Sequence, residues 1–261
     1  MASETVFPDA QSKLRAYLSV AETVTLLVKE IAADGSRMRL ADAEDLHPRK
    51  RVILGLAIKA YNAFECLSKD AAVPRSESFH HLKTMAETHI YFQWVGINTE
   101  EPRANLILAE ECRTKIALYR EVPELDPEGI LRDGLEKNCQ SFINGLEKEW
   151  KHFRKSKLLD LAKETSQDMV GWYNRVYRVA CEPAHISDLS EYMPPLRGAI
   201  TLNPPNGPAI FRSLIALDFG LQIIFDLLKN IFKIFELPLP ETVATPEREF
   251  YEIHRRPVPV R

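Results

Sequence analysis

An arginine and a histidine near the end of one apolar-periodic segment form the most suggestive chemical pair in the sequence. Arg178 precedes His185 by seven residues, and Pro183 should end the helix between them. A histidine can move a proton to or from a ribose hydroxyl at neutral pH, and an arginine can hold a phosphate through two parallel hydrogen bonds. The pair could therefore cleave RNA without a metal ion. The alternative is a helix-terminal histidine that interacts with the helix dipole and an arginine on a solvated face.

Four further side chains could bind substrate or support this pair. Tyr173 and Tyr177 share a helix face just before Arg178. Glu87 is the only carboxylate in the otherwise apolar segment 78–96, so it should either face water or pair with a cation. His89 lies in the same segment, where a histidine is more often a hydrogen-bonded core residue than a ligand.

Metal and nucleotide sites lack their usual signatures. Glu77 and His81 are four residues apart and could supply two metal ligands, but the sequence offers no third. The chain contains no GxGxxG, GxxxxGK[ST], GxSxG or HExxH pattern, and no paired Glu-x-x-His of the di-iron bundles. We therefore expect neither a metal nor another cofactor.

The elements that must position these residues are helices. Glycine is scarce, no turn pair separates two alternating apolar runs, and prolines fall between segments with helical apolar spacing. These features predict an all-α, single-domain bundle of about seven to eight helices over residues 1–237, followed by a Pro-rich, basic tail over 238–261 that should be extended. The expected helices cover residues 8–33, 48–73, 78–96, 102–121, 123–155 as one long surface helix, 158–180 and 209–235.

Composition excludes several classes of protein. The chain has 261 residues and a formal net charge of −3, with 45% apolar and 27% charged residues, which excludes a disordered chain and a highly basic nucleic-acid-binding arm. The four cysteines form no CxxC pair, no secretory signal is evident, and the most apolar stretch carries five charges. We expect a cytoplasmic protein with reduced thiols, no membrane partner and no DNA-specific signal.

Three stretches of the sequence resemble the DUF5677 type of bacterial helical protein, a family of unknown function. They are FHHLKTMAETHIYFQWV at 79–95, Trp150 upstream of Leu161-Ala162, and YNRVYRVACEPAHIS at 173–187. The resemblance extends over about residues 10–235. It implies a helical fold and a His-x-Ser element that adds Ser187 to the supporting residues.

The spacing of Arg178 and His185 is also similar to the Arg-x4–6-His element of the HEPN superfamily. That similarity implies a metal-independent ribonuclease of a stress or phage-defence system, with RNA as substrate and a homodimer whose two subunits share the active site. By this analogy Arg178 and His185 are the catalytic residues. The alternative is a non-catalytic binding module with a pocket lined by Tyr173, Tyr177, Trp94 and His89.

Overall fold

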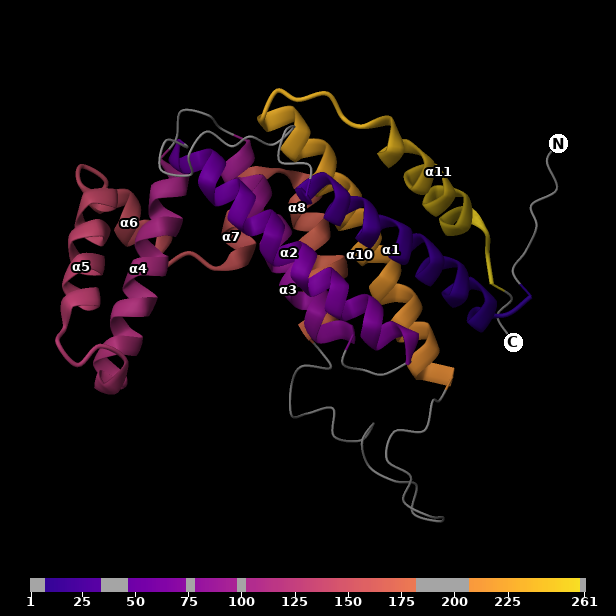
Figure 1. The fold of residues 1–261 in the computed structure, drawn as a ribbon, viewed down its shortest axis with the longest axis horizontal. Helices are drawn as coiled ribbons and strands as arrows, with labels where there is room; N and C mark the ends of the chain where they lie inside the picture. Colours follow the sequence, from indigo (N-terminus) through magenta and orange to yellow (C-terminus); the bar gives the residue numbers. More distant parts are fainter. Residues whose placement is uncertain (1–7, 34–46, 74–77, 98–101, 182–206, 259–261) are drawn as a thin grey trace, which may run out of the picture.

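The computed structural model describes residues 8–33, 47–73, 78–97, 102–181 and 207–258, and these residues form helices and no strand (Figure 1). The predicted all-α fold is confirmed. Prolines mark two helix starts as expected, because proline fixes the backbone angle that a first helical turn requires. Helix α2 spans Pro48–Ala72, and α4 spans Arg103–Glu121 directly after Pro102.

Helix α3, Ser78–Gly96, lies at the centre of the bundle. It packs against α2 on one side and against α10, Gly207–Ile234, on another. Eleven of its nineteen residues are buried, so its apolar surface continues around most of the helix, as expected for a central helix. Helix α1, Ala10–Ala33, completes the core with a single stripe that packs on α10 and α2: Leu14, Tyr17, Val20, Ala21, Val24 and Leu27.

The prediction of one long helix over residues 123–155 is wrong. The segment divides into a 3₁₀ turn, η1 (Pro123–Leu125), and the helices α5 (Ile130–Ile143) and α6 (Glu147–Phe153). Gly129 and Gly145 have φ values of +72° and +78°, in the left-handed region where a right-handed helix cannot continue. Helix α5 turns back along α4, and we call this pair, residues 103–143, the α4–α5 arm (Figure 1).

The predicted single helix over residues 158–180 is interrupted twice. Ser166 is extended, with φ −171°, and its hydroxyl accepts the backbone N–H of Met169 to start a new helix. A π-helix then replaces α-helix over five residues. The segment therefore consists of α7 (Leu158–Thr165), α8 (Gln167–Trp172), η2 (Tyr173–Tyr177) and α9 (Arg178–Cys181), which raises the number of helical segments above the predicted seven to eight.

The expectation of an extended tail is also wrong, because residues 241–255 form helix α11 (Glu241–Arg255). Its apolar face packs on α1, with Phe250 fully buried between Tyr17 and Phe225. At its end, His254 Nδ1 lies 2.6 Å from the carboxylate of Asp218 on α10, which also accepts the Tyr17 hydroxyl. Burial of this face stabilises the helix despite Pro246 in its interior. The boundary between a domain and a tail at residue 237 stays a prediction.

Replacement of Phe250 by alanine tests whether α11 is part of the folded core. We expect Phe250→Ala to lower the free energy of unfolding by about 3–5 kcal/mol, because a fully buried ring leaves a cavity. The matched control is Phe211→Ala on α10, where the ring is 50% exposed and the loss should stay below about 1 kcal/mol. Urea denaturation measures both values. Equal small losses would contradict the docking of α11.

Candidate functional site

Arg178 lies at the exit of the π-helix η2, as the first residue of α9. A π-helix is rare and occurs frequently at functional sites, because its wider turn shifts the following side chains around the helix axis. The Arg178 side chain is exposed, and no described residue forms a hydrogen bond or an ion pair with it. The guanidinium is therefore free to bind an anion such as a phosphate.

Two tyrosines and a carboxylate come together at the helical segment that precedes Arg178. The rings of Tyr173 and Tyr177 stack with centroids 5.3 Å apart, and both side chains are half-buried. Burial raises the pKa of Tyr177, and the Cys181 thiol, the Glu87 carboxylate and Tyr173 act in the same direction. Tyr177 thus keeps its proton at neutral pH. Glu87 is half-buried on α3 and has no cation partner in the described part of the chain.

The other predicted members of this site, His185 and Ser187, lie outside the described residues. The structure therefore brings Tyr173, Tyr177 and Glu87 to one place, and Arg178 follows Tyr177 directly in the chain. The approach of His185 to Arg178 stays a prediction from the sequence.

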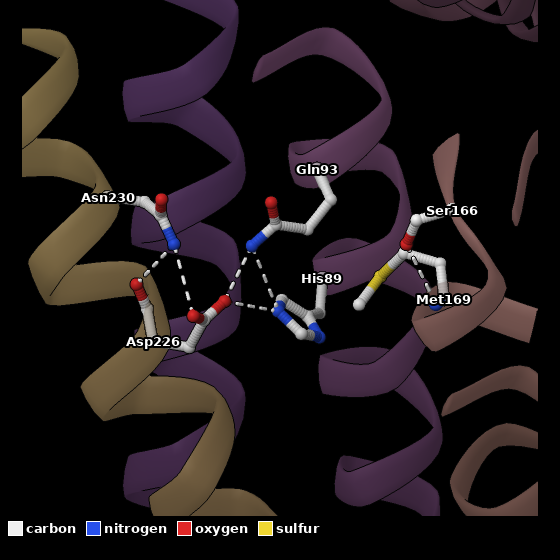
Figure 2. Close-up of polar contacts among 6 residues, drawn as sticks. All are labelled: His89, Gln93, Ser166, Met169, Asp226 and Asn230. Atoms are coloured by element: carbon white, nitrogen blue, oxygen red, sulfur yellow. Dashed lines mark hydrogen bonds and ion pairs between the residues drawn. The ribbon is translucent and has the colours of Figure 1, made fainter. Parts of the chain in front are cut away.

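His89 belongs to a different polar cluster, on the side of α3 that faces α10 (Figure 2). Its side chain is 1% exposed, and its Nε2 atom lies 2.7 Å from Oδ2 of Asp226. Gln93 donates its amide N–H to the same oxygen at 2.5 Å, and Asn230 donates to Oδ1 at 3.1 Å. One carboxylate thus accepts hydrogen bonds from three side chains and joins α3 to α10.

Asp226 is held in its ionised form by this cluster. Partial burial acts to raise the pKa of its carboxyl group, but the hydrogen bonds and charges of His89, Gln93 and Lys229 outweigh that effect and leave the pKa below its ordinary value. Because the carboxylate is an acceptor only, His89 Nε2 carries the proton of this hydrogen bond.

The His89 ring also packs against an aromatic side chain. The rings of His89 and Trp172 lie nearly perpendicular with their centroids 5.1 Å apart, and Phe219 packs against Trp172. The Nδ1 atom of His89 is buried and has no hydrogen-bond partner among the described residues. The imidazole is thus held in place by Asp226 and by packing, as a structural residue of the core rather than a group that reaches solvent. This position agrees with the interpretation of His89 as a hydrogen-bonded core histidine.

Trp94 makes contacts with α6 and α7. It is 3% exposed, its indole N–H donates to Glu164 at 2.8 Å, and its ring stacks on Phe153 of α6. The aromatic residues expected to line one pocket are therefore distributed over separate contacts, with Tyr173 and Tyr177 packed on each other and His89 in the core.

Sequence reasoning missed Asp226 and Asn230. Asp226 entered the sequence analysis only as one of five charges that argue against a membrane span. The position of Asp226 is a stronger indication of a buried contact. Its carboxylate lies inside the most apolar segment, and the amide of Asn230 follows four residues later on the same helix face. Such a pair indicates a buried polar contact, although the sequence does not reveal its partner on another helix.

The described residues contain no group of three or more histidine, cysteine, aspartate or glutamate side chains that could hold a metal ion. His81, considered above as a metal ligand, instead pairs with Asp70 at 3.0 Å. A search of the described helices for one long and apolar enough to cross a membrane found none.

The chain matches the model of a known protein family. The model of the "Family of unknown function (DUF5677)" matches residues 52–194, which is more than half of the chain. The protein therefore belongs to the DUF5677 family, and the resemblance seen in the sequence is confirmed over residues 52–194 of the expected 10–235. The matched segment includes Arg178 and His185, whereas α1, α10 and α11 lie outside it. No curated protein and no solved structure matches the chain.

The pKa of Asp226 predicts a specific dependence of stability on pH. Because the folded-state pKa is below the unfolded value, the unfolded chain binds more protons, and the contribution of Asp226 is present at neutral pH and lost as pH falls below about 4. We expect the urea midpoint of Asp226→Asn to be lower than wild type at pH 7 and to fall less steeply with acid.

The matched control for this measurement is Asp133→Asn, since the Asp133 side chain is 66% exposed on α5. Its acid dependence should equal that of the wild type. A parallel fall of all three midpoints would contradict the role of Asp226.

Proposed function

We propose that the protein is a metal-independent endoribonuclease of the HEPN-like kind, an effector of stress or phage defence, with Arg178 and His185 as its catalytic pair. The observation that carries the proposal is the exposed Arg178 guanidinium at the exit of a π-helix, without a partner in the described part of the chain and seven residues before a histidine. An exposed guanidinium without a protein partner is suited to binding a phosphate diester through two parallel hydrogen bonds.

The reaction needs only these two side chains and the ribose of the substrate. His185 removes the proton of the 2′-hydroxyl, and the 2′-oxygen attacks the adjacent phosphorus. The bond from phosphorus to the 5′-oxygen breaks, and the leaving oxygen takes up a proton from a solvent water, while His185 returns its proton to solvent. The products are a 2′,3′-cyclic phosphate and a 5′-hydroxyl. Arg178 binds the non-bridging phosphate oxygens and stabilises the charge that develops there.

The surrounding residues have roles in this proposal. The half-buried Tyr173–Tyr177 stack offers a surface for a nucleobase, and Ser187 supports His185. Burial raises the pKa of Tyr177, with a smaller contribution from Glu87, and the protonated hydroxyl can donate a hydrogen bond. Exposed lysines and arginines of segment 148–157 provide a further contact for the RNA backbone. A homodimer would let Arg178 of one protomer act with the histidine of its partner.

The test is an RNA-cleavage assay in EDTA with wild type, Arg178→Ala and His185→Ala. We expect the wild type to release products with cyclic-phosphate ends, and each variant to lose at least about 100-fold in rate, since a general base alone typically contributes that factor. The matched control is Arg248→Ala, which removes an exposed side chain from α11 and should leave the rate unchanged.

Cleavage that persists equally in His185→Ala would contradict the assignment of this histidine. Absence of cleavage by the folded wild type, measured both as monomer and at concentrations that favour a dimer, would favour the alternative, a non-catalytic binding module. In that module the half-buried Tyr173–Tyr177 stack beside Glu87 would form the ligand contact.

A further inference from the structure

The outer end of the α4–α5 arm concentrates exposed apolar side chains. Among the described residues, fourteen large apolar side chains are exposed, and five of them lie between residues 118 and 131. The others are spread over the remaining elements. Isolated exposed apolar side chains are ordinary on a protein surface, but a concentration of them marks an interaction site. We call this group the arm tip: Leu118, Val122, Leu125, Ile130 and Leu131.

The arm itself does not cover this tip. Helix α5 packs along α4 and lies away from α1, α10 and α11 (Figure 1), and none of its side chains is buried. Its contacts with the core come from its last turns, where Cys139, Phe142 and Ile143 are partly buried. At the opposite end, Ile130 is 66% exposed. The tip therefore presents apolar surface that the fold leaves unpartnered.

The arm tip is surrounded by uncompensated negative charge. Residues 118–137 contain six carboxylates and three basic side chains, so this short segment carries a net charge of −3, equal to that of the whole chain. Two of its cations are already engaged, because Arg120 pairs with Glu136 at 2.7 Å and Arg132 lies 3.7 Å from Asp133. Three exposed carboxylates have no ion-pair partner in the described part of the chain: Glu121, Glu124 and Glu128.

We propose that the arm tip docks a basic amphipathic helix of a partner protein. The apolar face of such a helix buries the tip, and flanking lysines or arginines meet the three free carboxylates. The charge disfavours the other occupants. In a two-fold contact between copies of this chain, two negatively charged tips would be brought together, and a nucleic acid or an anionic membrane would be repelled. The proposal does not depend on the ribonuclease activity.

The test uses two labelled helical peptides, one of leucine and lysine and one with glutamate at each lysine position, titrated against the full chain by fluorescence anisotropy. We expect the lysine peptide to bind at least about tenfold more tightly than the glutamate peptide. The double substitution Ile130→Ser with Leu131→Ser should weaken the lysine peptide by about tenfold or more. Glu124→Gln with Glu128→Gln should weaken it and reduce its salt dependence.

The matched control is Leu26→Ser with Ile58→Ser, two apolar side chains of similar exposure on α1 and α2. This variant should bind the lysine peptide as the wild type does. Equal losses in the control and tip variants, or equal binding of the two peptides, would overturn the proposal. So would a concentration-dependent dimer in sedimentation velocity that the tip substitutions abolish, since a second copy would then be the occupant. Because all substituted side chains are exposed, thermal unfolding should be unchanged, and the glutamine variant tests the site even if the serine variant unfolds.

Discussion

Burial of α3 on nearly all sides is the constraint on which the rest of the structure depends. A helix with apolar residues around most of its circumference has to be enclosed, and α2, α10 and the segment from α7 to α9 supply that enclosure. The few polar side chains of α3 then have fixed surroundings. Glu87 faces the π-helix, whereas His89 and Gln93 face Asp226 of α10. Two polar environments with separate roles thus share one helix.

The Asp226 carboxylate and the Arg178 guanidinium differ in whether the protein supplies their hydrogen-bond partners. The Asp226 carboxylate takes its hydrogen bonds from within the protein, and these bonds connect two helices of the core. Arg178 has no such partner among the described residues. A carboxylate that accepts several hydrogen bonds from the protein fixes the helices that it joins, while an exposed cation without such a partner can bind an external ligand. This contrast is the physical reason to place the proposed chemistry at Arg178 and to treat His89 as structural.

The sequence was most informative where a local rule decides the structure. Proline marked the starts of α2 and α4, and apolar spacing predicted α3 with its observed bounds. The sequence did not reveal the helix breaks at Gly129 and Gly145. A glycine with positive φ can lie between two helical segments, and the spacing of apolar residues does not show the break. The helix α11 was missed because Pro246 and the flanking prolines suggested an extended chain, whereas burial of Phe250 against α1 decided the outcome. The pairing of His89 with Asp226, 137 residues apart, is a tertiary contact with no local signature.

The packing of α1 against α11 has a consequence for the synthesis of the chain. Lys13 donates to a backbone carbonyl 243 residues further along, so the apolar stripe of α1 finds its partners on α10 and α11 only when nearly all of the chain described here has been made. At ordinary rates of translation this interval is about 12–50 s. During that time α1 exposes its stripe on the growing chain, and final closure joins segments with a large separation in sequence, which slows folding. The newly made chain is therefore most vulnerable to aggregation and to chaperone capture at its first helix.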